Sequence, residues 1–396
     1  GIGSSLKRES NEQGNDAARQ QRLGFRIEPD VSGGKLTLQA EAHHGRSGDA
    51  WGMPTLPIYS ESGSSYMRQA VFDMLDQGAS LQGRYSWRGD HDAENLLQAY
   101  VDRERTQFTG LAGTGTSPSS GGVGQPPSVH TLGGDKTDLD LEFQQRRVSG
   151  NHDFIWGFNL RHTKDELALP IGPFLLTDSI DRRMNYSAFV HDEWAWVPDR
   201  FKLIVGSKFE HDGLTGWNVQ PNIRTLYTPN TSEAYWSALS RSVRSPRRTQ
   251  SMTTIDYAAR DASQLPGSAL PPGVTAMTQS TPIPGAKRKA EDAWTLESGW
   301  RKQFSSFLSL DTAFFYSRYD GLSAARLSPL DPAAMVSQAG PCLFNAAYLA
   351  AGRCYVVIPM YNSNEDRARS WGAETAIPKW MPVWLGSTTD KLNSQF

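Results

Sequence analysis

Four arginines lie close together in the second half of the chain, at Arg241, Arg244, Arg247 and Arg248. A guanidinium group presents a planar fork of donors that suits carboxylate or catecholate oxygens. The spacing is therefore compatible with a binding site for an anionic chelate. The alternative is that carboxylates of the same protein hold these side chains, which then simply complete the end of a strand.

The adjacent His43 and His44 form a second candidate site, because imidazole can ligate the iron of haem. Neighbouring residues of a strand point to opposite faces, so the two rings cannot share one site without a bulge. We therefore keep His43 as the candidate ligand-binding residue, and haem as a disfavoured ligand.

The rest of the sequence contains no motif that indicates an enzyme. Residues 110–124 (GLAGTGTSPSSGGVG) lack the following lysine of a phosphate-binding loop. No Ser/His/Asp order, metal-ligand spacing or carboxylate pair stands out. We expect neither an enzyme nor a metal site.

The composition suits strands rather than helices. The 396 residues include 12 Trp, 13 Tyr, 16 Phe and 36 Gly, and the formal net charge of −2 gives no reason to expect nucleic acid as a partner. No stretch approaches the roughly 18 apolar residues of a membrane-spanning helix. A barrel strand, however, hides its lipid-facing side in an alternation of apolar and polar residues.

Such an alternation recurs along the chain. In residues 201–210, for example, Phe201, Leu203 and Val205 alternate with Lys202 and Gly206. A helix would scatter this pattern around its circumference, and each segment has about the ten residues that a tilted strand needs to cross a bilayer. The same pattern is found at about 20–28, 36–43, 94–103, 138–144, 153–161, 185–196, 216–227, 233–240, 293–301, 308–317 and 369–378.

The connections between these segments alternate in length. The short ones are 29–34, 89–93, 148–151, 197–200, 228–232 and 302–306. The long ones are about 45–79, 106–135, 163–183, 241–290 and 319–367, with one brief link near 213–216 and a possible short helix at 66–77. Outer-membrane barrels have short periplasmic turns and long extracellular loops. The sequence therefore predicts an all-β, antiparallel transmembrane β-barrel.

The polar parity of the strands predicts a wet or plugged interior. It carries charged residues such as Glu41, Asp138, Asp140, Lys208 and Glu210. We expect about thirteen strands, whose two edges would expose unpaired backbone groups to hydrocarbon. The chain is therefore predicted to be part of a larger barrel.

Four blocks of sequence, in order, resemble one protein family. They are RLGFRIEPDVSGGKLTLQAEAHHGRSGD (22–49), the run from YSAFVHDEWAWVPDRFKLIVG to SRSVRSPRR (186–248), WTLESGWRKQF with LSLDTAFFYSRYDGL (294–322) and SWGAETAIPKW (370–380). Their order and spacing are similar to the barrel of TonB-dependent outer-membrane receptors. The resemblance covers most of residues 1–396 except the long loops.

The resemblance implies a monomeric barrel of about 22 strands in the bacterial outer membrane, with its C-terminal strands and N-terminal plug domain missing from this chain. It further implies energy-coupled uptake of a scarce ligand, with a ferric siderophore as the transported iron chelate. Haem and cobalamin are less favoured, and no resident cofactor is expected. The TonB–ExbB–ExbD complex would act through the plug, and outer-membrane lipid would surround the wall. This fragment alone is expected to be inactive.

The two cysteines, Cys342 and Cys354, both fall in the predicted loop 319–367. Because that loop would be assembled in an oxidising periplasm, we expect a disulfide. Closing a loop of about a dozen residues would stabilise it by roughly 3 kcal/mol.

Two other functional classes remain open at this stage. One is a passive, porin-like outer-membrane channel with the same wall. The other is a non-transporting barrel adhesin whose loops bind partners. What precedes residue 1, a plug or further strands, would discriminate the importer from the channel.

Overall fold

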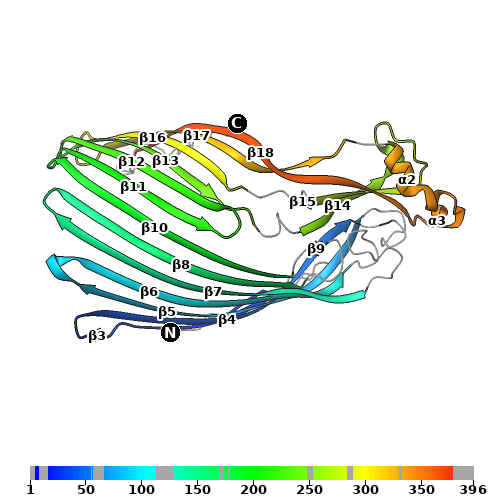
Figure 1. Cartoon of the computed structure of the whole chain (residues 1–396), viewed down its shortest axis with the longest axis horizontal. Helices are drawn as coiled ribbons and strands as arrows, with labels where there is room; N and C mark the ends of the chain where they lie inside the picture. Colours follow the sequence, from blue (N-terminus) through cyan, green and yellow to red (C-terminus); the bar gives the residue numbers. More distant parts are fainter. Residues whose placement is uncertain are drawn as a thin grey trace.

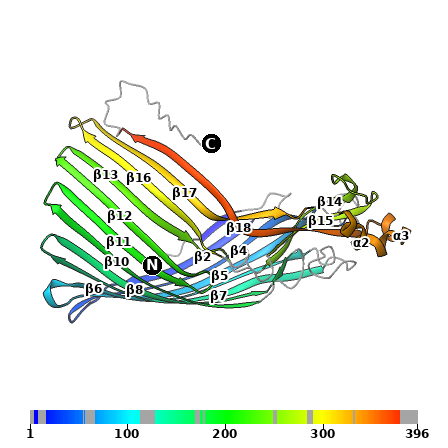
Figure 2. The ribbon, with the colours of Figure 1, turned by 45° about the horizontal axis from the view of Figure 1, so that its top comes forward.

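The computed structural model describes residues 5–8, 17–54, 56, 67–112, 128–168, 174–176, 179–247, 253–282, 289–329 and 332–377. Within these ranges, thirteen strands of ten or more residues form one wall (Figures 1 and 2). The wall strands are β2 (Ala18–Ile27), β4 (Gly34–Pro54), β5 (Met67–Arg88), β6 (Glu94–Ala112), β7 (Ser128–Ser149), β8 (His152–Ala168), β10 (Ile180–Val197), β11 (Phe201–Asp212), β12 (Gly216–Asn230), β13 (Glu233–Arg244), β16 (Glu291–Gln303), β17 (Ser309–Leu327) and β18 (Cys354–Ala376).

Each wall strand pairs antiparallel with the next in this order. The wall curves into a trough, with β4–β8 on one side and β16–β18 on the other (Figure 1). Among the described residues no ladder joins β18 to β2: β18 pairs with β17 and β15 (Val274–Pro282), and β2 pairs with β4 and with the short β1 (Ser5–Arg8), so the sheet is open along that line. The predicted all-β antiparallel barrel wall is confirmed.

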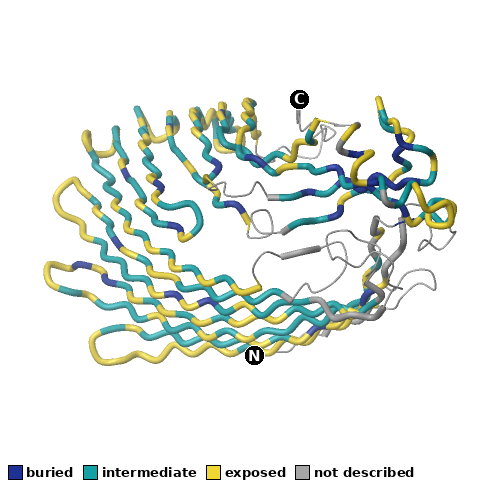
Figure 3. Tube along the Cα trace, turned by 45° about the vertical axis from the view of Figure 1, so that its right-hand side comes forward, coloured by how far each residue is buried: buried dark blue, intermediate teal, exposed yellow. Residues whose placement is uncertain are grey.

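The two faces of the wall are the reverse of those of a soluble protein. Along β10, apolar residues such as Met184 and Val190 are exposed, while the residues between them are partly covered. Figure 3 shows this alternation along the wall strands. Leu23 is 66% exposed, whereas Asp140 is only 6% exposed. An apolar outer face with a polar inner face is the arrangement of a barrel in lipid.

The six predicted short connections lie together at one end of the wall (Figure 1). The link after β2 contains the two-residue β3 (Asp30–Val31) and turns at Gly33, whose φ of 84° favours glycine. The link after β5 contains a single 3₁₀ turn, η2 (Asp90–Asp92).

The strands at the other end are much longer than the predicted ten residues. β4 and β5 stay paired from Gly34 opposite Trp87 to Pro54 opposite Met67. The predicted loop 45–79 and the short helix at 66–77 are therefore wrong, because those residues mostly continue the ladder. Residues 45–54 and 67–79 lack the regular apolar–polar alternation of the wall, so the sequence pattern did not reveal that the ladder continues there. The predicted loops 106–135 and 163–183 shrink for the same reason, and the latter contains β9 (Phe174–Leu176).

A small folded unit occupies the predicted loops 241–290 and 319–367, at the far right of Figure 1. It contains β14 (Thr253–Asp261), η4 (Ala262–Gln264), β15 (Val274–Pro282), α2 (Pro332–Leu343) and α3 (Ala346–Ala350). β15 pairs in parallel with the first residues of β18. The unit has its own apolar core, which includes Val274, Met335, Ala339 and Val356.

Cys342 of α2 and Cys354 of β18 are joined in a disulfide, with 5.6 Å between their Cα atoms. The bond ties the helices to the strand that continues into the wall. No helix in the described part of the chain is long and apolar enough to cross a membrane.

The brief link predicted near 213–216 is held by one carboxylate. Asp212 is 5% exposed, and its Oδ1 accepts hydrogen bonds from the backbone N–H groups of Leu214 (2.8 Å) and Thr215 (2.9 Å). Its Oδ2 accepts from the Asn185 amide on β10. Burial raises the pKa of Asp212, but these backbone hydrogen bonds outweigh it and hold the pKa below its ordinary value.

Asp212→Ala should therefore loosen this turn, because three or more hydrogen bonds lose their acceptor. We expect a loss of local stability of about 1–3 kcal/mol, measured by hydrogen exchange of the Leu214 and Thr215 amides. A lowered folded pKa means that the stabilisation is present at neutral pH and is lost as pH falls below about 4. Asp212→Asn should abolish the pH dependence while keeping part of the protection. Unchanged exchange in Asp212→Ala would contradict the assignment.

Candidate functional site

The inner face of the wall carries a network of ion pairs, and β7 and β8 provide the clearest examples. The Arg161 Nε lies 2.8 Å from Asp140 Oδ2, and Asn159 donates to the other oxygen of that carboxylate at 2.9 Å. Arg161 also stacks over the Tyr100 ring at 6.0 Å. Next along β7, Asp138 binds Lys136 at 2.6 Å. Two nearly buried carboxylates are thus each matched by a cation.

The network continues along neighbouring strands. Lys202 contacts Glu193 at 2.5 Å, and Lys208 contacts Glu210 at 2.8 Å. Gln220 on β12 donates to the same Glu210 at 3.2 Å. Paired charges of this kind leave a polar, largely neutralised surface that suits water or another polar body. The geometry supports passage or docking, rather than a reaction at one centre.

Two of the four candidate arginines, Arg241 and Arg244, lie on opposite faces of β13. Arg241 has the same parity as the outward-facing Leu239, and its register partner Trp294 is also exposed. Arg244 has the opposite parity and sits opposite Glu291. Residues three apart on a strand point to opposite faces, so Arg241 and Arg244 do not share one surface, and a ligand-binding role for the four arginines stays a prediction.

Carboxylates hold both of these arginines, as the alternative interpretation of the sequence has it. Arg241 Nε lies 3.0 Å from Asp292 Oδ2, and its Nη1 donates to the Val219 carbonyl at 2.6 Å. Arg244 donates to Glu291 Oε2 from Nη2 at 2.6 Å. Arg247 is exposed, and Arg248 lies outside the described residues.

Glu291 is a residue that the sequence analysis missed. It is 5% exposed and accepts from both Arg244 and the Ser323 backbone N–H, the latter at 2.8 Å. The carboxylate thereby joins β13, β16 and β17 at the rim. The sequence around Glu291 does not reveal this role, because its partners Arg244 and Ser323 lie on other strands, 47 and 32 residues away along the chain.

His43 lies on the inner face, where its Nε2 is 3.6 Å from Asp76 Oδ2. Its ring covers Gly78, so that a Cβ at that glycine would come within 2.6 Å of the His43 Cε1. His44 is exposed on the opposite face, as strand geometry requires. The described residues contain no group of three or more His, Cys, Asp or Glu side chains that could hold a metal ion.

The wall with its apolar outside, paired polar inside and one-sided extensions defines a barrel protein of the outer-membrane type. Residues 10–393 match the family model described as "TonB dependent receptor-like, beta-barrel". The chain therefore belongs to the family of TonB-dependent receptor β-barrels, which comprises outer-membrane receptors and transporters rather than enzymes.

Solved structures show the same fold at low sequence identity. The siderophore receptor PirA from Acinetobacter baumannii superposes with a TM-score of 0.61 at 12% identity, covering 92% of this chain and 51% of PirA. A variant of the ferric enterobactin receptor PfeA from Pseudomonas aeruginosa gives 0.60 at 15%, covering 94% and 51%. The FrpB iron transporter from Neisseria meningitidis gives 0.55 at 14%, covering 91% and 50%. The chain spans about half the length of these structures. A comparison with curated protein sequences returned no match.

The substitution Glu291→Gln tests whether the ion pair of Arg244 stabilises the folded wall. Arg244 and the Ser323 N–H bind different oxygens of Glu291, and an amide keeps only one oxygen, so one donor would face the NH₂ group and the free energy of unfolding should fall by about 1–3 kcal/mol. Urea unfolding in detergent measures this loss. Glu297→Gln on the same strand is the control and should change little. An unchanged unfolding midpoint in Glu291→Gln would instead leave Arg244 free for a ligand.

Proposed function

We propose that this chain forms the wall of an outer-membrane receptor for energy-coupled uptake of a scarce ligand, and that the ligand is a ferric siderophore. The observation that carries the proposal is the inner face, which is polar and charged but internally paired. Such a lining does not form a hydrophobic core, and it suits a hydrated passage or a polar domain inside the barrel. Family membership supports the same proposal.

The structural relatives point to iron as the cargo. Their names describe a siderophore receptor, a ferric enterobactin receptor and an iron transporter. Haem and cobalamin are the secondary candidates. The site near His43 gives no support to haem, since the imidazole is already matched by Asp76 and covers Gly78.

Selectivity is proposed to lie in the extracellular extensions rather than in the wall. The wall charges pair with each other, so binding a chelate there would first have to break ion pairs such as Arg161–Asp140. The disulfide-linked unit of β14, β15, α2 and α3 stands beyond the wall and offers surfaces that are not committed in this way.

The remaining partners follow from the receptor proposal. The protein would act as a monomer in the bacterial outer membrane, surrounded by lipid. A plug domain within the barrel would pass force from the TonB–ExbB–ExbD complex to the ligand site. A passive channel and a non-transporting adhesin are the two alternatives that the test must separate.

The test is uptake of radioactive iron by iron-starved cells of the source bacterium, with and without the gene. Deletion should abolish uptake of at least one ferric siderophore, and a plasmid copy should restore it only when TonB is present. Restoration without TonB would indicate a passive channel. Unchanged uptake of every iron, haem and cobalamin source would refute the importer and favour an adhesin.

A further inference from the structure

Two arginines face each other directly on the outer surface of the wall. The register of β2 and β4 places Arg19 opposite Arg46. Both share the outward parity of Leu23 and Phe25, which are 66% and 53% exposed. Among the described residues, neither arginine has an ion-pair partner. Like charges directly opposite on adjacent strands destabilise a sheet unless something neutralises them.

Several other cations on the same rim have a carboxylate of the protein beside them. Arg103 and Arg105 on β6 both lie 3.6 Å from Asp135. Arg318 and Arg369 are also registered opposite each other, but Arg318 Nε lies 2.9 Å from Asp320. Among the described residues, the Arg19–Arg46 pair therefore differs from these clusters in having no protein carboxylate between the two cations.

The pair lies just beyond the apolar band. Arg19 is four residues past Leu23, or about 13 Å along the strand. For a strand tilted by about 40°, this is about 10 Å along the membrane normal, and the headgroup layer is about 5–8 Å thick. A long arginine side chain can reach back to that layer. The guanidinium groups therefore come to the level of the headgroups on the extracellular side.

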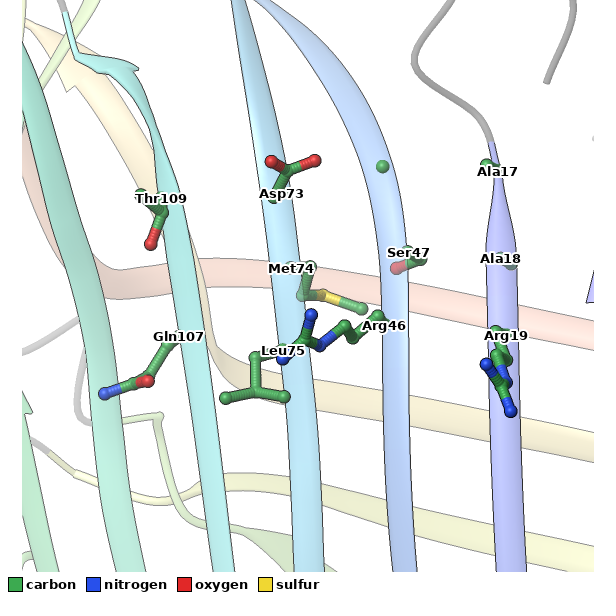
Figure 4. A pocket seen from close by; sticks show the side chains of 11 residues that line it. Ala17, Ala18, Arg19, Arg46, Ser47, Asp73, Met74, Leu75, Gln107 and Thr109 are labelled. Carbon is green, nitrogen blue, oxygen red and sulfur yellow. The ribbon is translucent and has the colours of Figure 1, made fainter.

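A shallow pocket of about 540 Å³ lies beside the pair on β2, β4, β5 and β6 (Figure 4). Arg46 reaches from β4 toward Leu75 on β5, which is its register partner. Gln107 and Thr109 on β6 add polar groups to the lining. Asp73, the nearest acid of the lining, lies one row further from the apolar band than Leu75.

These features identify an amphipathic anion as the occupant. Two guanidinium groups suit phosphate oxygens, and Leu75, the register partner of Arg46, offers apolar contact beside them. Arg19, which lines the pocket, also shares the outward parity of Leu23 and Phe25. We infer that Arg19 and Arg46 bind a lipid of the outer leaflet whose phosphate-bearing headgroup has a net negative charge. The inference depends on the membrane placement of the wall and not on the cargo.

The experiment compares the wild-type full-length protein with the double variant Arg19→Gln/Arg46→Gln. Both are titrated in neutral detergent with bisphosphorylated lipid A, with phosphatidylcholine, or with inorganic phosphate, and bound lipid is counted by native mass spectrometry. Wild type should bind lipid A at least about tenfold more tightly than the variant does. Phosphatidylcholine and inorganic phosphate should bind neither protein measurably. The matched control is Arg88→Gln/Arg200→Gln, which removes two exposed arginines at the short-turn end and should behave as wild type.

Thermal unfolding in lipid-free detergent supplies a second readout that does not depend on lipid counting. Removing an unneutralised like-charge pair should leave the double variant at least as stable as wild type, and only wild type should gain stability with lipid A. Equal lipid A affinity in both proteins would overturn the inference. So would tight binding of inorganic phosphate, which would mark a free-anion site. A less stable double variant without lipid would show that a group of the protein itself occupies the pocket. Iron uptake enters neither readout, so the inference can fail while the receptor proposal stands.

Discussion

Hydrocarbon cannot hydrogen-bond a peptide group, so every N–H and C=O within the bilayer must find its partner on a neighbouring strand. The long antiparallel ladders from β2 to β18 meet that demand. Once the backbone is satisfied, side chains sort by face: apolar residues such as Leu141 and Val190 point to lipid, and Asp140 points inward. The inverted burial of this protein is a direct consequence.

The inward side chains meet a second constraint, because a charged group that is partly removed from water is stable only when an opposite charge lies beside it. The Arg161–Asp140 and Lys208–Glu210 ion pairs neutralise such charges within the wall. Pairing also makes the wall a poor place for selectivity. In the receptor that we propose, recognition would therefore lie in the extracellular extensions, where a disulfide and a separate core stabilise the structure beyond the wall.

The alternation of apolar and polar residues made the wall predictable from sequence, because one face must meet lipid at every second residue. Beyond the lipid-facing part of the strands this requirement no longer applies, and the sequence pattern did not predict the structure there. β4 and β5 continue through residues 45–54 and 67–79, which we had expected to form a loop and a short helix. The ion-pair partners of the arginines could not be predicted for another reason. Which carboxylate meets Arg241 or Arg244 depends on the register of strands about fifty residues apart, and local spacing does not encode it.

The central claim is that one parity of each wall strand meets lipid while the other meets water. Single cysteines at Ser187, Ala188, Phe189 and Val190 of β10, labelled with a nitroxide in the reconstituted protein, test it most directly. Collision rates with oxygen should peak at Ala188 and Val190, and collisions with a water-soluble nickel chelate should peak at Ser187 and Phe189. Rates that do not alternate, or that favour the nickel chelate at Ala188 and Val190, would contradict the account.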